Sequence, residues 1–379
     1  MRRFKWFRVL ATIIIILLAV VLFISKMYNF HYSPDVDNLN FVKLEEGYKI
    51  EVFADDLGKA KVSIPGPNNG VRMIDHKDGV FYAAIPGRGQ VVTIHDKDQD
   101  WKEDKRTIFM EGLLRPHGIA LYQDWVYIAA EDKVIRVKDL NGDYVADLDT
   151  MEELVDLPLG THWTRTIKIF DDQLYVSIGS TCNVCIEKDW KRAAIIKCDL
   201  DGSNCKAFAT GLRNAVDFIQ YEGKIWATDN GRDLAGKDIP PDEINIIKEG
   251  KDYGWPYCYG QNELDKEFVE ELDIEFDEDS CKFKEAPIYE IPAHSAPLGL
   301  EFYEGDLLVA LHGSWNRDPP VGYNVIRIDI DTGDISEFAS GFIDGSQVYG
   351  RPMDLLIIDD NILLTDDVAG KIYRIYKDG

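Results

Sequence analysis

Positive charge is what this sequence has least of, with 42 lysines and arginines against 67 aspartates and glutamates and a net charge of −25 at pH 7. A chain with this balance cannot readily assemble the basic face that binds a phosphate backbone, so we exclude nucleic acid as a partner. If the ligand is anionic, the few arginines near it must be concentrated locally. No convincing amphipathic helix interrupts the strand repeats described below, which favours an all-β domain.

The N-terminal segment lacks the signals of cleavage and lipidation. Four basic residues precede an apolar run over residues 9–24, and neither a small-x-small site nor a lipobox cysteine follows it. With the aromatic residues in front, the run is long enough to cross a hydrocarbon layer of ~30 Å. We therefore expect a cytoplasmic stub and a single uncleaved transmembrane helix within residues 1–28, a linker over 29–43, and an extracytoplasmic domain over 44–379. A cleaved signal peptide is the alternative.

Cysteine is also scarce, and the six that are present lack the second ligand pair of matching spacing that a zinc site needs. In an oxidising compartment they favour disulfides. The expected pairs are Cys198 with Cys205 across a hairpin turn, Cys258 with Cys281 around an acidic insertion, and Cys182 with Cys185 in a CxxC loop. The CxxC pair is compatible with either a tight disulfide or two thiols.

Two acidic runs, over residues 96–104 and 139–147, lack the residues of an EF-hand. They alternate acids in the manner of a calcium loop, but neither has glycine at position six and glutamate at position twelve. We interpret them as solvated hairpin tips, with a calcium loop as the alternative. A third acidic run, over 262–280, is interpreted as a surface insertion.

What the sequence does contain is a strand pair that recurs six times. Each copy has a hydrophobic strand after a polar turn, a loop, and a second strand in which valine or isoleucine alternates with charge. The copies begin at Gly79, Trp125, Gln173, Lys224, Asp306 and Asn361, at intervals of about 56 residues. Six units of four short strands predict a six-bladed β-propeller. We expect 48–53 to close it by pairing with the blade around 361–376.

Loops at one end of a propeller's channel converge, so residues far apart in sequence can line one pocket. Polar residues recur next to the first strands of the expected blades. They are Arg72, His117, His162, Arg213, Asn214, Asp229, Asn230, Gly231, Arg232, His294, His312 and Arg351. His162 stands at the mouth of a hairpin over 167–178, where a rigid sheet can hold a titratable ring against a ligand. A structural histidine is the alternative.

The motifs HWTRTIKIFDDQLYVSIGS, GLRN, DNGRD, APLGLEFY and HGSWNR, in this order, resemble the glucose/sorbosone dehydrogenase-like family of soluble quinoprotein dehydrogenases. The resemblance runs from EEGYKIEVFADDL to the closing KIYRI. It implies a six-bladed propeller that uses pyrroloquinoline quinone (PQQ) and calcium to oxidise a sugar. PQQ carries three carboxylates, so an acidic protein needs arginine and histidine where it binds.

The resemblance also implies roles for individual residues. His162 matches the general base, and Arg213 with Asn214 matches a pair against the quinone carbonyls. The main-chain carbonyls of Gly231 and Arg232 match the calcium ligands. We expect His117, Arg232, His312 and Arg351 to complete the cofactor site, with His312 in the place of a lysine and Met353 in the place of a second arginine.

The sequence thus predicts PQQ-dependent oxidation of a sugar hydroxyl at the extracytoplasmic face of the cell membrane, with an electron acceptor that it does not identify. Two alternatives stay open. A calcium-dependent lactonase-like hydrolase requires Asp229, Asn230 and Asn214 to converge on one metal. A non-catalytic propeller that binds at the cell surface is favoured by the departures from the family pattern at positions 232, 312 and 353.

Overall fold

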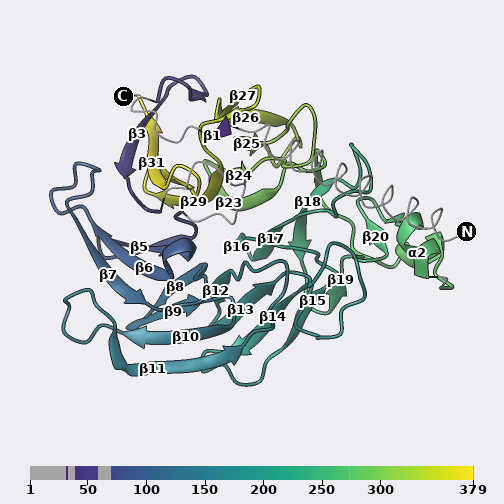
Figure 1. Cartoon of the computed structure of the whole chain (residues 1–379), viewed down its shortest axis with the longest axis horizontal. Coiled ribbons are helices and arrows are strands. Elements are labelled where there is room, and N and C mark those ends of the chain that lie inside the picture. Colours follow the sequence, from purple (N-terminus) through teal and green to yellow (C-terminus); the bar gives the residue numbers. More distant parts are fainter. Residues whose placement is uncertain (1–30, 33–38, 59–69, 273, 379) are drawn as a thin grey trace, which may run out of the picture.

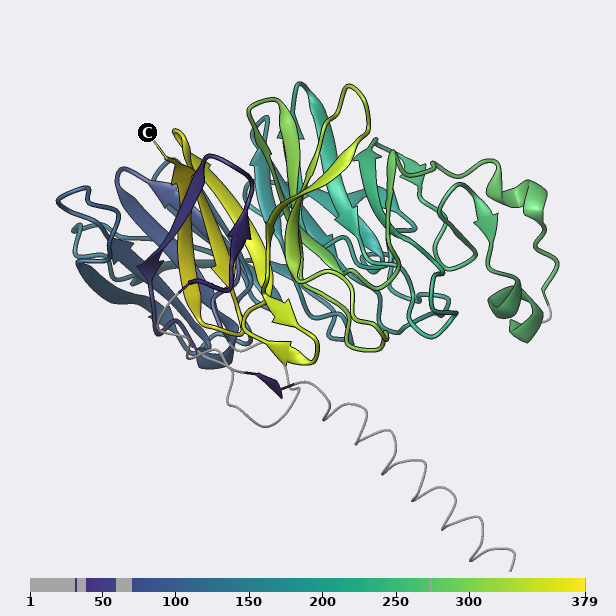
Figure 2. The same cartoon turned by 90° about the horizontal axis from the view of Figure 1, so that it is seen from above.

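The computed structural model describes residues 31–32, 39–58, 70–272 and 274–378. Six β-sheets of four or five strands are arranged in a ring, and two smaller sheets accompany them (Figures 1 and 2). This arrangement confirms the all-β six-bladed propeller. The anchor expected within residues 1–28 lies outside the described residues. Among the helices that are described, none has the length and apolarity to span a membrane.

Each blade contributes four antiparallel strands, numbered outward from the channel. Blade 1 is β4 (Ile74–Lys77), β5 (Val80–Ile85), β6 (Gln90–His95) and β7 (Lys105–Glu111), and blade 2 is β8 (Gly118–Tyr122), β9 (Trp125–Ala129), β10 (Lys133–Lys138) and β11 (Asp147–Asp156). Blade 3 is β12 (Ile167–Phe170), β13 (Gln173–Ile178), β14 (Ala194–Asp199) and β15 (Lys206–Thr210), and blade 4 is β16 (Phe218–Tyr221), β17 (Lys224–Asp229), β18 (Asp242–Ile247) and β22 (Tyr289–Ile291). Blade 5 is β23 (Pro297–Tyr303), β24 (Asp306–Leu311), β25 (Asn324–Ile328) and β26 (Ile335–Ser340).

Blade 6 closes the ring by combining the two ends of the domain. Its strands are β29 (Pro352–Ile358), β30 (Asn361–Asp366), β31 (Lys371–Lys377) and, outermost, β3 (Tyr48–Ala54) from the N-terminal side. β3 pairs antiparallel with β31, with Tyr48 opposite Lys377 and Val52 opposite Tyr373. The predicted closure is therefore confirmed. It hydrogen-bonds a strand edge that would otherwise be exposed.

Apolar side chains from neighbouring blades form the core. Between blades 6 and 1, for example, Phe53, Phe81, Val92 and Leu363 belong to one buried cluster. Both faces of the second strands are covered by the adjacent blades, so β5 is buried along its whole length. This explains why these strands read as continuous hydrophobic runs in the sequence.

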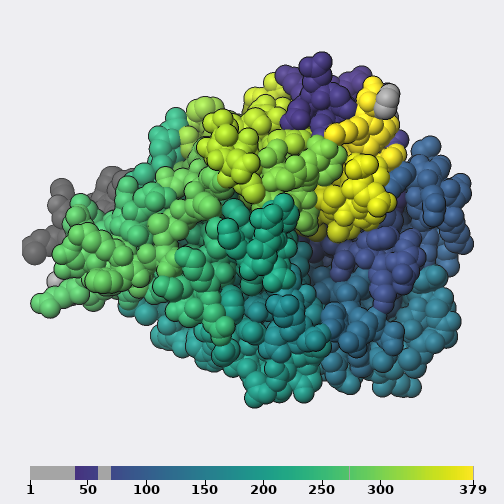
Figure 3. Space-filling view, turned by 180° about the vertical axis from the view of Figure 1, so that it is seen from behind, coloured from purple at the N-terminus to yellow at the C-terminus, as the bar shows by residue number. Residues whose placement is uncertain are grey.

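Short elements decorate the propeller. β2 (Lys43–Leu44) extends blade 5 and β19 (Lys251–Asp252) extends blade 3, while β1 (His31–Tyr32), β27 (Ile343–Asp344) and β28 (Gln347–Val348) form a small separate sheet. A 3₁₀ helix, η1 (Pro86–Arg88), joins β5 to β6. The insertion between β19 and β22 holds β20 (Cys258–Tyr259), β21 (Glu263–Leu264), α2 (Lys266–Leu272) and α3 (Glu278–Cys281). It projects from one side of the disc (Figures 1 and 3).

All three cysteine pairs form disulfides, which confirms Cys198–Cys205 and Cys258–Cys281. The structure also decides between the two states left open for the CxxC pair, Cys182 and Cys185, in favour of the disulfide. The acidic runs over 96–104 and 139–147 occupy the turns between β6 and β7 and between β10 and β11, which confirms that they are hairpin tips. In the first turn, carboxylate oxygens of Asp96, Asp98 and Asp104 lie within 4.8 Å of one another. Asp96 also accepts backbone hydrogen bonds from Asp100 and Trp101, which stabilise the turn by themselves.

Candidate functional site

A cavity of about 270 Å³ opens at one end of the channel, where the loops that precede the innermost strands converge. The residues that sequence analysis singled out and that line it are Arg72, His162, Arg213, Asn214, Asn230, Gly231, His294, His312 and Arg351. They come from blades 1, 3, 4, 5 and 6. Only the closed ring of blades brings these segments together, because they are separated by up to about 280 residues along the chain.

The loop that carries His162 is held rigidly by buried arginines. Arg165 donates from Nη1 to the carbonyl of His162 at 2.8 Å and from Nη2 to the carbonyl of Pro158 at 2.8 Å. Arg192 donates to the carbonyl of Gly179 at 2.8 Å. A Cβ on Gly179 would lie 2.6 Å from the Cβ of His162, so only glycine fits this position of the strand end. The histidine is therefore positioned by its backbone as well as by its ring.

Hydrogen bonds identify the tautomer of His162. Nδ1 lies 3.0 Å from the carbonyl oxygen of Ser180 and 2.8 Å from its Oγ. The Ser180 hydroxyl donates its own proton to the carbonyl of Cys182 at 2.6 Å, so it accepts from the ring. Nδ1 therefore carries the proton, and Nε2 is left as an unprotonated acceptor. Burial, followed by the nearby charge of Arg213, lowers the pKa of His162 to about 3, which keeps the ring neutral.

Arg213 also lines the cavity, within a dense set of polar contacts. Its Nε and Nη2 donate to the main-chain and side-chain oxygens of Asn183, each at 2.9 Å, and Nη1 donates to the carbonyl of Asn230 at 3.1 Å. Nη2 also pairs with the Asp233 carboxylate at 3.3 Å. Asn183 stands between the two cysteines of the CxxC disulfide, so the disulfide loop fixes the guanidinium plane.

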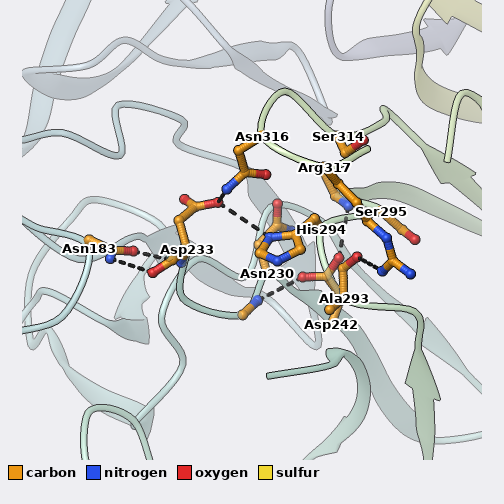
Figure 4. A network of polar contacts seen from close by, with 12 residues as sticks. Asn183, Asn230, Asp233, Asp242, Ala293, His294, Ser295, Ser314, Asn316 and Arg317 are labelled. Carbon is orange, nitrogen blue, oxygen red and sulfur yellow. Dashed lines mark hydrogen bonds and ion pairs between the residues drawn. The ribbon is translucent and has the colours of Figure 1, made fainter. Parts of the chain in front are cut away.

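Asp233 links Arg213 to the ring of His294, and Figure 4 shows the contact between Asp233 and His294. The ring Nδ1 of His294 lies 3.6 Å from Asp233 Oδ1, and Nε2 donates to the carbonyl of Gly236 at 2.8 Å. Asn316 donates to the same carboxylate oxygen at 3.0 Å. The hydrogen bond to Asp233 raises the pKa of His294, although burial opposes it. This wall of the cavity is thus polar but close to charge balance.

Arg72 and His312 also line the cavity, and they form a buried ionic group with Asp367. Arg72 Nη2 lies 2.8 Å from Asp367 Oδ2, and His312 Nε2 lies 2.9 Å from Oδ1. Burial would raise the pKa of Asp367, but His312 and Arg72 outweigh it and hold the pKa at about 2. Burial and the charge of Arg351 lower the pKa of His312 to about 4, so it is a neutral donor to an ionised carboxylate near pH 7.

Arg351 differs from the other two cavity arginines because it has no carboxylate partner within the described part of the chain. Its Nε donates to the carbonyl of His312 at 2.7 Å, its Nη2 donates to the carbonyl of Gly313, and the guanidinium lies 5.3 Å from the Tyr323 ring centroid. The guanidinium of Arg351 is therefore held by neutral groups and makes no direct ion pair in the described part of the chain, although its charge also helps to lower the pKa of Asp367. An anionic ligand is the natural counterpart of such a charge.

Two residues expected to face the cavity do not. His117 is fully buried behind the wall, 3.5 Å from Arg72 Nη1 and edge-on to Trp163, so it packs against the lining without joining it. The Arg232 side chain turns toward the insertion, where Nε pairs with Asp265 at 2.7 Å and Nη2 pairs with Glu267. Of the six residues predicted to share one pocket, His162, Arg213, His312 and Arg351 do so.

The structure also shows what sequence analysis missed. Met353, expected beside the cofactor in place of an arginine, is fully buried in an apolar cluster below the cavity. Asp367, Asn183 and Ser180 position cavity residues without a recognisable motif of their own. Asp229, one of the polar residues expected at the site, instead holds the backbone beside it: its carboxylate accepts from the amides of Arg213 and Asn214 at 2.9 and 2.6 Å.

The same contact bears on the hydrolase alternative. Both oxygens of Asp229 are engaged by backbone amides, and Asp229 does not line the cavity. The side-chain amide of Asn230 donates to the carbonyl of Pro297 at 2.7 Å. Asp229 therefore presents no free carboxylate in the cavity, although Asn214 and Asn230 both line it.

Comparison with known proteins identifies the family. Residues 42–341 match the family model described as TrAA12-like. The chain belongs to the TrAA12-like family. This places it among PQQ-dependent sugar dehydrogenase-like oxidoreductases and confirms the resemblance drawn from the motifs at that level.

Three similar proteins illustrate how the TrAA12-like chain relates to others. An uncharacterized protein of Borreliella burgdorferi is 33% identical over 367 residues, which span 88% of this chain and 90% of that one. The PQQ-dependent pyranose dehydrogenase of Coprinopsis cinerea is 26% identical, but the match spans 57% of this chain and only 40% of that protein. The holo structure of the PQQ domain of a pyranose dehydrogenase from the same fungus superposes with a TM-score of 0.74 at 19% identity, covering 92% of this chain and all of the domain.

Proposed function

We propose that this TrAA12-like protein is a PQQ-dependent dehydrogenase that oxidises a sugar hydroxyl, with His162 as the general base. The observation that carries the proposal is a cavity lined by Arg213, Arg351 and His162, whose ring keeps an unprotonated Nε2. Sugar oxidation requires a base to accept the hydroxyl proton as hydride leaves the same carbon. PQQ, when bound, supplies the quinone that accepts the hydride.

The cavity fits the charge of the cofactor. Three arginines line it although the whole chain has a net charge of −25. Asp233 and Asp367 balance two of them, and Arg351 is left to meet a carboxylate. An anion beside Arg213 also opposes the positive charge that acts on His162. Loading the cavity is therefore expected to raise the pKa of His162 and to strengthen it as a base.

Calcium is proposed at the main-chain carbonyls of Gly231 and Arg232. Gly231 lines the cavity, and a side chain there would lie 2.6 Å from the carbonyl oxygen of Pro241, so the backbone is tightly packed. Because the Arg232 side chain points into the insertion, it leaves only main-chain oxygen for a ligand. Carbonyl oxygen suits this hard cation, which polarises a quinone.

The cavity mouth offers a surface for the sugar. Trp315 lines the cavity and is still 44% exposed, and Asn316 beside it supplies a polar side chain. A flat apolar face next to hydrogen-bonding groups complements a sugar ring, which has both kinds of surface.

We further propose that the protein works at the extracytoplasmic face of the membrane. The three disulfides and the apolar run over residues 9–24 support this location.

Purified protein stripped of metal and loaded with PQQ and calcium tests the proposal. We expect PQQ to bind at micromolar concentration or better, and the loaded protein to reduce a redox dye when a sugar panel is supplied. Protein without PQQ is the control and is expected to be inactive. A protein that binds no PQQ would overturn the proposal and favour a propeller that binds at the cell surface without catalysis.

Replacing Arg351 by alanine is expected to weaken PQQ binding by about 1.5–3 kcal/mol, because a charge-assisted contact to a carboxylate is lost. Turnover should return at high PQQ concentration. Arg317→Ala is a matched control, since Arg317 pairs with Asp238 outside the cavity lining. Isothermal titration of both variants measures the difference, and equal affinities would contradict a cofactor role for Arg351.

A further inference from the structure

The direction of the strands assigns every loop of a blade to one of the two ends of the propeller. Arg72 and Arg351 line the cavity and precede innermost strands, so these strands begin at the cavity end. The turn between the first and second strands therefore lies at the far end. The turn between the second and third strands returns to the cavity end, as His312 shows, and the turn between the third and fourth lies at the far end again.

Exposed apolar side chains gather at the cavity end. In the described part of the chain, seven exposed large hydrophobic residues lie in loops at this end, whereas only two, Leu140 and Val145, lie in turns at the far end. The other eight lie on outermost strands or in the insertion. The seven residues, which we call the apolar rim, are Leu114, Leu159, Ile186, Trp190, Leu234, Ile239 and Trp315.

The apolar rim is close in sequence to residues that line the cavity. Trp315 lines it directly, Leu234 follows Asp233, and Leu159 precedes Thr161 by two residues. Leu234 is 73% exposed and Leu159 is 59% exposed. Exposed apolar residues gathered at a cavity mouth are typical of a surface that another surface covers. Two of the seven are tryptophans, a residue type that is enriched where lipid meets water.

The first described strand of the chain lies at the same end. β1 pairs in parallel with β28, with His31 opposite Gln347 and Tyr32 opposite Val348. β28 belongs to the loop between blades 5 and 6, and it ends three residues before Arg351, which lines the cavity. In Figure 2 the short β1 arrow lies outside one face of the disc. The chain therefore enters the domain at the cavity end.

A short tether would then join this end to the membrane. Only six residues separate the apolar run over 9–24 from His31. Even a fully extended chain of this length spans at most about 25 Å. If the apolar run lies in the membrane, the cavity end cannot move far from the lipid. A tether also keeps the local concentration of the membrane surface high, so weak contacts are sufficient to hold the domain against it.

We propose that the cavity end of the propeller lies on the lipid surface of the membrane that holds the N-terminal segment. This inference rests on the membrane location given under the proposed function. The apolar rim enters the headgroup region, and the cavity mouth faces the lipid. The bilayer is favoured over a protein partner because the tether brings lipid to this end. The net charge of −25 favours zwitterionic over anionic lipid.

Tryptophan reporters at the two ends test this orientation. Leu234 at the cavity end and Leu140 at the far end are 73% and 68% exposed, so each position has room for an indole. Full-length Leu234→Trp and Leu140→Trp are reconstituted without PQQ into phosphatidylcholine vesicles, with or without bromine on the acyl chains as a quencher. We expect brominated lipid to remove roughly half or more of the fluorescence that Leu234→Trp adds to the wild type, because an interfacial side chain meets the acyl chains. The fluorescence added by Leu140→Trp should stay.

A second reporter guards against a variant that does not fold. Leu159→Trp lies in a different loop of the cavity end and should be quenched as Leu234→Trp is. Absence of quenching at the cavity end, or equal quenching at both ends, would overturn the proposal. Flotation of the same vesicles separates the causes. Protein that floats without quenching contradicts the orientation alone, whereas protein that does not float contradicts the membrane location as well. Neither result bears on PQQ binding or sugar oxidation.

Discussion

Replacing His162 by asparagine is expected to lower the rate of sugar oxidation by the PQQ-loaded protein by roughly 10²–10⁴-fold, the usual contribution of a positioned general base. Asparagine can still donate to the Ser180 carbonyl, as Nδ1 of the ring does. It has no basic nitrogen in place of Nε2. We therefore expect PQQ affinity and Tm to change little while the rate falls.

Ser180→Ala is the matched control for this variant. It removes the Oγ acceptor of Nδ1 but leaves the Ser180 carbonyl, so it loosens the ring without removing the base. We expect a smaller fall in rate than in His162→Asn. Steady-state kinetics with dye as acceptor and titration of PQQ separate the two effects. If His162→Asn instead lost stability and PQQ affinity together while the rate per bound cofactor stayed constant, the histidine would be structural.

The pH dependence of stability gives a further check on His162. Its folded pKa of about 3 lies below the ordinary value of 6.5. Between these values the unfolded chain takes up a proton that the folded ring does not, so the free energy of unfolding falls as the pH falls through this window. His162→Asn removes this term. The free energy of unfolding of the variant minus that of the wild type should therefore be higher at pH 5 than at pH 8.

Replacing Asp367 by alanine is expected to lower the free energy of unfolding by about 3–5 kcal/mol, because it leaves the buried guanidinium of Arg72 without its partner. The contribution of Asp367 also depends on pH. Its folded pKa of about 2 lies below the ordinary 3.8, so its stabilising effect is present above about pH 4 and is lost as the pH falls toward 2. Urea unfolding at several pH values measures both effects.

A double variant distinguishes charge from packing in this prediction. Removing both partners, in Arg72→Leu with Asp367→Leu, leaves no buried charge from this pair, and we expect it to cost less stability than Asp367→Ala alone. If the stability lost in the double variant equals the sum of the losses in the two single variants, Asp367→Ala acts by leaving a cavity. Because Arg72 lines the proposed cofactor site, this comparison is made on stability alone.

Strand periodicity was sufficient to predict the propeller because each blade buries both faces of its sheet, which requires the same pattern of apolar residues in every repeat. The six strand pairs, the closing pair of β3 with β31 and two of the three disulfides are local or repetitive features that were predicted from the sequence. For the CxxC pair the sequence left a disulfide and two thiols open. Turn chemistry was equally visible: Asp171 and Asp172 have φ values of +50° and +58°, as a two-residue hairpin turn demands.

Side-chain direction at the cavity could not be obtained in this way. Arg232 is adjacent to Gly231 in the sequence, yet its side chain points into the insertion because Asp265 and Glu267 lie there. His117 has the same kind of strand-end position as His162, but it is buried behind Arg72 and Trp163. Such differences depend on what the neighbouring blade presents, which no local pattern encodes.

The sequence by itself determined the repeat, the cysteine pairing, the acidity of the chain and the set of residues from which a site is drawn. The tertiary structure alone decided which of them meet, since closure of the ring sets Arg72 against Asp367, which is 295 residues away in the chain. It also decided that Lys168 meets four carboxylates in the channel. The physical reason is that charge balance and hydrogen-bond satisfaction in a propeller are settled between blades, whereas periodicity describes only what happens within one.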